Sequence, residues 1–361
     1  MSWNMEGRSF PDRRSMTDQR AGKVLIVGLG SGSKRLLKLI HETSSPNIDT
    51  LFITTDEQDI PLTNADTKFL VGRRLCGGKG SMGLTELGER SVEDARRDLE
   101  PFMKGYNLII QLATLGRGTA SGGAHVVASI GEGLGSTVIN FLILPSATLE
   151  SMPRTIANHA KNNMIKRGFK VVSIDQDRFQ EINGQQPFSR TLAALDALMS
   201  WIVVSLADTI YGRTERSLTI SDLRSVFKEG NEGSIFIGGS FMGDPRTAAE
   251  EFISCGLMKR DPKTGKGFLL NLVTPKGLKD TATKPFIEEL LDLVHAEDKT
   301  VFIGSLEDPG RTDVVDLIGI ITGMDDGSVK FADVTKAHQH SPARHIPHSN
   351  PADRWEIPMI R

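Results

Sequence analysis

The sequence predicts an α/β fold in which a parallel sheet covered by helices is followed by one long helix and a smaller α+β domain. Two patterns lead to this prediction. Up to residue 186, short apolar runs alternate with amphipathic stretches, which is the order of successive βα units in a parallel sheet with helices on both faces. Residues 187–212 then form a single amphipathic segment, and strand-like runs outnumber helical ones in residues 213–325.

Bulk properties narrow the class of protein. The chain has 361 residues, enough for about two domains, and its 39% hydrophobic and 24% charged residues are typical of a globular protein. A formal net charge of −2 argues against nucleic acid as a partner. No unbroken apolar run reaches the ~18 residues of a membrane span, and the N-terminus lacks a signal-peptide core. We therefore expect a cytoplasmic protein without direct membrane insertion. Cys76 and Cys255 lack metal-ligand spacing and are expected to be buried or idle thiols.

The first domain is predicted over residues 22–186, after a disordered polar tail at residues 1–21. Its first strand, residues 23–27, ends in a glycine-rich loop before a helix near Lys34. Small residues at a helix N-terminus leave backbone N–H groups uncovered, and a phosphate is favoured there. The candidates in this loop are Gly28, Gly30, Ser31 and Gly32. Ser33 takes the place of the third glycine of the Rossmann dinucleotide fingerprint, so that motif is incomplete.

Three elements are predicted between this loop and the next. The second strand, residues 50–56, ends in hydroxyl and carboxyl side chains that include Thr55 and Asp56. Residues 72–88 contain six glycines and are expected to form a long flexible segment. Residues 89–103 are expected to form one charged surface helix.

A second glycine-rich loop follows an apolar strand at residues 108–112. It carries Gly116, Gly118 and Thr119, and its helix is predicted to begin at about Ala124. Such a turn can be a tight connection that binds no ligand. A second loop of the same kind, about 90 residues after the first, instead favours one nucleotide contacted from both sides.

The remaining elements complete the predicted fold. Two more βα units have strands at residues 137–144 and 170–174. In residues 187–212 apolar side chains recur at steps of three and four, which predicts a central helix about 35 Å long. The C-terminal domain, residues 213–325, is predicted to contain strands at residues 234–237, 268–273, 301–303 and 314–322, and helices near residues 248–254 and 285–294.

These motifs together resemble the FtsZ/tubulin family, and FtsZ more closely than tubulin. The run from Gly116 to Gly122 is similar at five of seven positions to the family signature GGGTGSG, and residues 78–88 are similar to the FtsZ loop GLGAGGNPEVG. The other matches are the E-x-x-x-R pair Glu150 and Arg154, the dipeptide Asp177-Arg178, and the spaced aspartates Asp196 and Asp208. They keep their order and nearly constant spacing from residue 23 to residue 325, so the resemblance implies the tubulin/FtsZ fold.

The resemblance implies GTP or GDP as the ligand and leaves Mg²⁺ open. The phosphates would be surrounded by the glycines of both loops and Thr119. The other candidates for nucleotide binding are Ser31, Thr55, Asp56 and Gln176, the last of which replaces the asparagine of the family's N-D-R. Gly80 and Gly83 would lie in the loop that responds to the γ-phosphate, and Glu150 and Arg154 at the ribose. Asp196 would accept from the N1–H and the N2 amino group of guanine. Without the resemblance, Asp196 is a solvated residue on the polar face of its helix.

Two departures from the family pattern concern charge. Arg117 replaces the central glycine of the signature, and its guanidinium could pair with a phosphate or point to solvent. The family pattern N-x-D-x-x-D, which completes the site of the next subunit in a head-to-tail filament, falls on Ser217, Thr219 and Asp222. Hydroxyls are not bases near neutral pH. The chain is therefore expected to bind GTP and to assemble with itself, while catalysis in trans is slow or absent.

The C-terminal segment is predicted to contain a second functional element. Residues 326–352 are rich in Pro, His, Ser and Asp and predict a flexible linker. Its four histidines could hold a metal, but flexible spacing and the lack of cysteines favour a plain polar linker. Residues 353–361 resemble the FtsZ C-terminal peptide, which implies that a membrane-tethering adaptor binds Trp355, Ile357, Pro358 and Ile360.

Three functions are compatible with these patterns. The first is an FtsZ-like GTP-binding protein that forms cytoskeletal filaments in cell division or a related membrane-associated process. The second is a non-hydrolysing regulatory paralogue that co-assembles with a separate FtsZ. The third, a nucleotide-dependent oxidoreductase, rests on the first glycine loop alone. It is disfavoured because the acid expected ~20 residues after that loop is missing, Asp56 being nearer 26 residues past Gly30.

Overall fold

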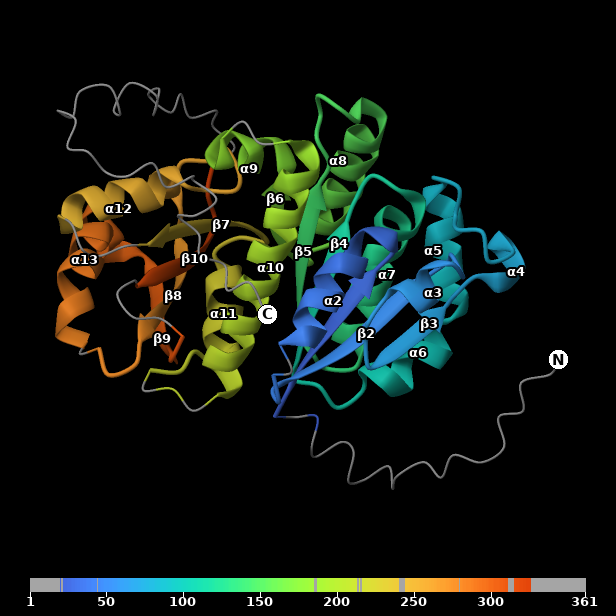
Figure 1. The fold of residues 1–361 in the computed structure, drawn as a ribbon, viewed down its shortest axis with the longest axis horizontal. Helices are drawn as coiled ribbons and strands as arrows, with labels where there is room; N and C mark the ends of the chain where they lie inside the picture. The colour runs from blue at the N-terminus through green and yellow to red at the C-terminus, as the bar shows by residue number, and fades with distance from the viewer. Residues whose placement is uncertain are drawn as a thin grey trace.

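The computed structural model describes residues 20, 22–43, 45–184, 187–212, 214, 216–239, 244–278, 280–310 and 315–325. The predicted linker at residues 326–352 and the predicted adaptor peptide at residues 353–361 lie outside the described residues, as do residues 1–19. In Figure 1 most of the elements before the central helix α10 lie to the right, and the elements after it lie to the left.

Within the described residues, one ten-stranded sheet runs through the molecule in the order β3-β2-β1-β4-β5-β6-β7-β10-β8-β9. Neighbours from β3 to β7 are parallel, β10 is antiparallel to β7 and β8, and β9 is parallel to β8. The strands are β1 (Val24–Leu29), β2 (Ile48–Thr54), β3 (Thr67–Leu70), β4 (Leu108–Thr114), β5 (Thr137–Leu144), β6 (Lys170–Asp175), β7 (Glu232–Gly239), β8 (Gly267–Pro275), β9 (Thr300–Asp308) and β10 (Asp316–Thr322). The predicted α/β fold with a parallel sheet is confirmed, and the strands predicted after the central helix continue that same sheet.

Helices cover both faces of this sheet. Alternate residues of each parallel strand enter different cores: Ile26 packs with α2 and α10, whereas Val27 packs with α6, α7 and α8. The helices are α2 (Lys34–Glu42), α3 (Asp59–Leu62), α4 (Arg73–Cys76), α5 (Thr85–Asp94), α6 (Arg96–Met103), α7 (Gly118–Gly133), α8 (Ser151–Lys166), α9 (Gln176–Asn183), α10 (Phe188–Tyr211), α11 (Ile220–Lys228), α12 (Pro245–Ser254) and α13 (Asp280–Leu293). Cys76 is buried and Cys255 is half-buried.

The central helix α10 connects the two parts of the sheet. Its last turn is tied to the rest of the chain by side chains: Asp208 accepts from Ser45 Oγ (2.8 Å) and Asn47 Nδ2 (2.9 Å), and Thr209 Oγ1 donates to Asn271 Oδ1 of β8 (2.9 Å). By length and composition alone α10 could cross a membrane, although its apolar residues form no unbroken run of ~18. Because 61% of its most apolar stretch is buried inside the protein, α10 is a core helix of this fold.

Helix α7 begins at Gly118, so the predicted start at about Ala124 is wrong. The small residues predicted to form a loop are the first turns of the helix, and α5 packs directly on them. A Cβ on Gly122 would overlap the carbonyl oxygen of Thr85, and a Cβ on Gly88 would overlap that of Gly118. Close approach of two backbones therefore stabilises a glycine-rich helix against its weak intrinsic propensity.

Two further predictions in this region are corrected. The segment at residues 72–88 is not continuously irregular, because it contains α4 and the start of α5. The single helix predicted over residues 89–103 is two helices, α5 and α6, separated at Ala95, whose φ and ψ of −89° and 1° are not helical. Both helices contribute to the same core, through Val92 of α5 and Leu99 and Met103 of α6.

A buried ion cluster joins the two parts of the sheet. Glu232 at the start of β7 accepts from Lys161 Nζ of α8 (2.9 Å), from Arg260 Nη2 (2.6 Å) and from Ser173 Oγ of β6 (2.7 Å). The charged side chains of this cluster are only 10–12% exposed. The carboxylate thus neutralises two buried cations at the β6–β7 junction.

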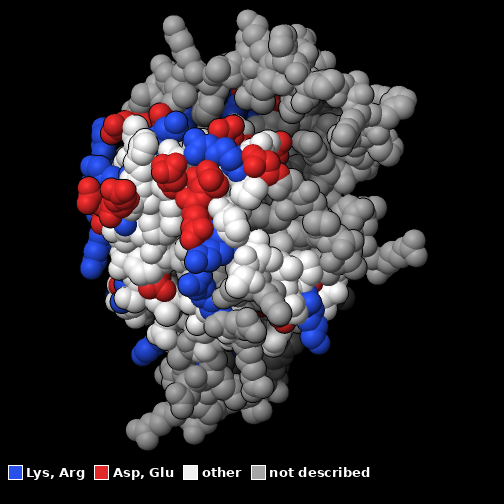
Figure 2. All heavy atoms as spheres, turned by 90° about the vertical axis from the view of Figure 1, so that its left-hand side faces the viewer, with Lys and Arg blue, Asp and Glu red and all other residues white. Residues whose placement is uncertain are grey.

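The outer layer of the C-terminal part consists of α12 and α13, whose apolar residues, such as Phe252 and Phe286, pack on β8 and β10. On the solvent side, Arg246 of α12 lies 3.2 Å from each of Glu250, Glu289 and Asp292. Figure 2 shows this side of the molecule, where acidic and basic side chains are interspersed. Exposed pairs of this kind contribute little to stability, because solvent screens them.

Candidate functional site

The two glycine-rich loops meet at the carboxyl ends of β1 and β4. Gly28 of β1 is paired in register with Leu112 of β4, so both strands end at the same level of the sheet. A Cβ on Gly30 would lie 3.5 Å from Ala120 N in the first turn of α7, and one on Gly32 would lie 2.5 Å from Thr114 Cβ. The two predicted loops are therefore in contact, and the N-termini of α2 and α7 lie side by side at the carboxyl ends of the central strands β1 and β4.

A buried carboxylate that the sequence did not single out holds the first loop. Asp59 is 4% exposed. It accepts from Ser31 Oγ (2.6 Å), Lys34 Nζ (2.6 Å) and Thr54 Oγ1 (2.9 Å). These bonds connect the loop, the start of α2 and the end of β2. The sequence did contain a signal for this role: Asp59 is an acidic residue shortly after the second strand, and the first glycine loop carries hydrogen-bond donors.

Thr119 connects the second loop to the end of β2 and to the segment before α5. Its hydroxyl lies 2.7 Å from Thr55 Oγ1 and 3.1 Å from Ser81 Oγ. The segment is also fixed by its backbone, since Gly80 N donates to the carbonyl of Thr55 (3.1 Å) and Asp56 forms a β-bridge with Lys79. Three further predicted residues lie in these loops. Gly83, with a φ of +79°, lies just before α5, and Gly118 packs on Leu84. Gly116 N donates to Ser121 Oγ.

The predicted ribose residues have other partners. Arg154 donates to both carboxylate oxygens of Asp175 (2.7 and 3.0 Å) and to the carbonyl of Pro145 (2.9 Å), and the bonds to Asp175 raise its pKa above the usual value. Gln176 Oε1 accepts from Ser146 N (3.1 Å). Arg154 and Gln176 therefore fix the loop between β5 and α8.

The Arg117 side chain lies at the surface beside the loop after β5. Its guanidinium is 79% exposed and lies 3.7 Å from Glu150 Oε1. Glu150 is 37% exposed and precedes α8. The pair spans the gap between the second glycine loop and the loop after β5.

Asp196 faces the first loop from α10. The residue is 8% exposed, and burial raises the pKa of its carboxyl to about 6, although Arg35 opposes this shift. Arg35 Nε of α2 lies 2.7 Å from Asp196 Oδ2. Among the described residues, Oδ2 has no hydrogen bond of acceptable alignment. The carboxylate is thus paired with a cation at the start of α2.

Ser217, Thr219 and Asp222 lie beyond the other end of α10 and form the start of α11. Thr219 Oγ1 accepts from Asp222 N (3.1 Å), and Asp222 Oδ2 accepts from Thr219 N (2.8 Å), which is a reciprocal capping box. Ser217 and Thr219 are exposed. Within one chain, these residues are far from the glycine loops.

We expect Thr219→Ala to lower the free energy of unfolding by about 1 kcal/mol, because the N3 amide of α11 loses its acceptor. Thr219→Asp should leave stability within about 0.5 kcal/mol of wild type, since aspartate also caps helices. Urea unfolding of the three proteins measures both values. Equal stability of the alanine variant and wild type would contradict the capping role.

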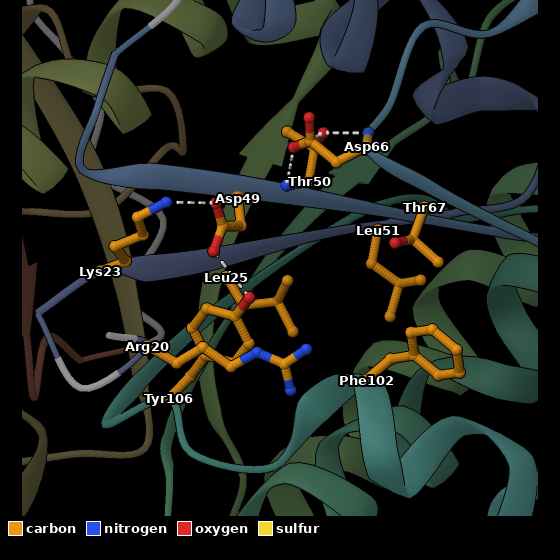
Figure 3. Close-up of a pocket in the computed structure, with 10 residues that line it drawn as sticks. All are labelled: Arg20, Lys23, Leu25, Asp49, Thr50, Leu51, Asp66, Thr67, Phe102 and Tyr106. Atoms are coloured by element: carbon orange, nitrogen blue, oxygen red, sulfur yellow. Dashed lines mark hydrogen bonds and ion pairs between the residues drawn. The ribbon is translucent and has the colours of Figure 1, made fainter. Parts of the chain in front are cut away.

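A cavity of about 240 Å³ lies at the opposite, amino end of the sheet (Figure 3). Leu25, Leu51 and Phe102 line its apolar part. Its charged residues are paired, Asp49 accepting from Lys23 Nζ and from the Tyr106 hydroxyl, both at 2.7 Å. None of the predicted site residues lines it.

Arg20 also lines this cavity and donates to the carbonyls of Pro101 (2.9 Å) and Lys104 (3.1 Å). It belongs to the segment predicted to be disordered, and its bonds show that the ordered contacts of the chain begin earlier than residue 22.

Comparison with known proteins identifies the region that carries both loops. The tubulin/FtsZ family, GTPase domain, matches residues 19–184. Those residues belong to the tubulin/FtsZ family. The chain is 24% identical over 272 residues to the cell division protein FtsZ of Methanothermobacter thermautotrophicus, and the alignment covers 75% of this chain and 71% of that protein.

Solved structures of the family share the fold of the whole described chain. An FtsZ dimer from M. jannaschii superposes with a TM-score of 0.76 at 22% identity, covering 87% of this chain and 93% of that one. CetZ2 from Haloferax volcanii, solved as a GTPγS-bound protofilament, has a TM-score of 0.70 at 17% identity over 84% and 94% of the chains. The predicted tubulin/FtsZ fold is confirmed.

Proposed function

We propose that this chain is a cytoplasmic FtsZ-like GTP-binding protein that assembles head to tail into filaments, in cell division or a related process, and hydrolyses GTP slowly. The observation that carries assembly is an apolar rim around the glycine loops. The large apolar side chains that are at least half exposed among the described residues all follow carboxyl ends of the sheet strands: Leu62, Met82, Leu84, Leu149 and Met152. An apolar rim at one end of a subunit favours burial against another copy.

The geometry supports a nucleotide at this end of the sheet. Two adjacent helix N-termini with glycine loops present N–H donors to phosphates. Asp196, next to the first loop, offers a carboxylate that complements the two donors of a guanine edge. Mg²⁺ forms part of the proposal as an ion held mainly by phosphate oxygens and water.

Slow turnover follows from the capping box. Hydrolysis in trans needs carboxylates that polarise the attacking water. Here Asp222 accepts from the backbone of Thr219, and Ser217 and Thr219 carry hydroxyls. Asp222 is thus the one carboxylate of the pattern, and because it already caps α11 it is poorly placed to polarise the attacking water.

The test is phosphate release from GTP, measured together with sedimentation, for wild type, Thr219→Asp and Thr219→Asn. Both variants keep the helix cap, and only aspartate adds a carboxylate. We expect wild type to pellet with GTP and release little phosphate, Thr219→Asp to release it at least tenfold faster, and Thr219→Asn to match wild type. Rapid phosphate release by wild type would contradict the proposal.

The same experiment tests the partner. Sedimentation only after addition of a separate FtsZ would replace self-assembly by co-assembly. We also propose that residues 353–361 bind a membrane-tethering adaptor. A vesicle pull-down with that adaptor, comparing the full chain with Trp355→Ala, measures this.

A further inference from the structure

Two buried amide side chains lie side by side in the parallel part of the sheet. Gln111 of β4 is paired in register with Asn140 of β5, and both residues are 0% exposed. Their side chains point to the face that α7 covers, because Ile109 and Leu142, two residues away along these strands, belong to the core on that face. Neighbouring strands are ~4.8 Å apart, so the two amides are close neighbours inside the core.

Apolar residues enclose the amide pair within the sheet. On the far side of Gln111, β1 contributes Val27 at the same register, and on the far side of Asn140, β6 contributes Val171. Both valines are fully buried. Bulk solvent therefore does not reach the two amides, and their hydrogen-bonding groups have to be satisfied within the core.

Most of the hydrogen-bonding capacity of this pair is unused. Asn140 Nδ2 donates to the carbonyl of Lys170 (2.9 Å). Asn140 Oδ1 and both amide atoms of Gln111, Nε2 and Oε1, have no hydrogen-bond partner within the part of the chain that the structure describes. A buried amide without a partner is costly, because it has given up its hydrogen bonds to water. Three polar atoms thus remain to be satisfied at one point of the core.

Helix α7 crosses the sheet above this point with small side chains. Near its start, a Cβ on Gly123 would lie 3.5 Å from Leu29 of β1. Near its end, a Cβ on Gly131 would lie 3.0 Å from Ile109, two residues before Gln111 on β4. The turns between these glycines therefore cover the amide pair. Two of the three residues that share this face of the helix are alanines, and all three are fully buried: Ala124, Val127 and Ala128.

We propose that Gln111 and Asn140 form a site for buried water, in which a water molecule accepts from the Gln111 amide and donates to Asn140 Oδ1. A buried water makes about three hydrogen bonds to polar groups that are otherwise unsatisfied, and this pair offers three such atoms beneath small side chains. The Gln111 amide can turn about its last side-chain torsion, so either of its polar atoms can face the water. The site lies apart from the glycine loops and does not depend on the proposed nucleotide.

The test is a high-resolution crystal structure of the wild-type protein and of Gln111→Met, which keeps the length of the side chain and removes the amide. We expect an ordered water in wild type within about 2.7–3.2 Å of both amide groups, and its loss in the variant. A direct hydrogen bond between Gln111 and Asn140, or a wild-type structure with no water between them, would overturn the proposal.

Urea unfolding provides a second measurement in solution. With a shared water, Gln111→Met and Asn140→Leu should each lower the urea midpoint, because each leaves the other amide without its bridge. The double variant should recover most of the loss, since no buried amide is then left unpaired. Ile109→Met places the same side chain one position earlier on the same face, and it is the control for packing.

The direction of these shifts decides the result. If the amides are dry and unpaired, removing one of them takes away a buried polar group, and Gln111→Met raises the urea midpoint relative to wild type. That rise would contradict the proposal. Losses that simply add in the double variant would contradict a water shared by the two side chains.

Discussion

Gly122→Ala is expected to lower the free energy of unfolding by about 3 kcal/mol, because the added methyl group overpacks the contact between α5 and α7. Besides overlapping the Thr85 carbonyl oxygen, the new Cβ would lie 2.7 Å from Glu89 N. These are backbone atoms, so no side chain can rotate away and α5 as a whole has to move. Because α5 follows the segment that carries Ser81, we also expect weaker nucleotide binding.

The control for this substitution lies in the same helix. Gly133, the last residue of α7, has no atom within 4 Å of its built Cβ. Gly133→Ala should be neutral or stabilising by up to about 1 kcal/mol, the difference in helix propensity. Guanidinium unfolding of both variants measures the contrast, and similar free energies for the two would show that the α5–α7 contact is not tight.

Glu232→Gln is expected to cost about 3–5 kcal/mol of the free energy of unfolding, because it removes the buried negative charge that Lys161 and Arg260 both contact. Glutamine keeps the shape and an acceptor for Ser173, so the loss reports on charge alone. Glu250→Gln, which removes one partner of the exposed Arg246, is the matched control and should leave the free energy of unfolding nearly unchanged, because solvent screens this pair.

The difference between Glu232→Gln and wild type should depend on pH with a defined sign. Burial by itself raises the pKa of Glu232, but Lys161 and Arg260 outweigh it, and the pKa lies below the usual 4.5. A lowered pKa stabilises the folded state above pH 4.5, and this contribution is lost as the pH falls through the folded-state pKa. Stability curves of the two proteins should therefore be parallel at neutral pH and converge in acid. A constant difference down to acid unfolding would contradict the role of the charge.

The sequence predicted best those elements whose local pattern and packing agree. Strand β5 has the predicted bounds because a buried apolar run has one stable conformation in a parallel sheet. Helix α10 was predicted to within one residue at each end because its apolar period extends over the whole helix. The local sequence pattern did not predict that α7 starts at Gly118, because that start depends on packing against α5, which is distant in sequence.

The candidate site was predicted as a set of loops, and the partners of individual side chains were not. Arg154 could not be assigned to Asp175, nor Asp59 to Ser31, because both pairings depend on how separate loops meet. The pairing of Thr219 with Asp222, in contrast, could have been predicted, since a T-x-x-D pattern before the apolar Leu223 is itself a capping-box signal. That signal was available in the sequence and was interpreted as remnants of a catalytic pattern.

Helix α10 has one more consequence, which concerns length. Asp196 in its first half contacts Arg35 of α2, and the helix ends where Asp208 and Thr209 are anchored, before the segment that leads to α11. A continuous helix of 24 residues is about 36 Å long and resists stretching. The helix therefore fixes the distance between the two ends of the subunit. In a head-to-tail filament, the axial repeat would be set by the number of turns in this helix and would stay constant whichever nucleotide is bound.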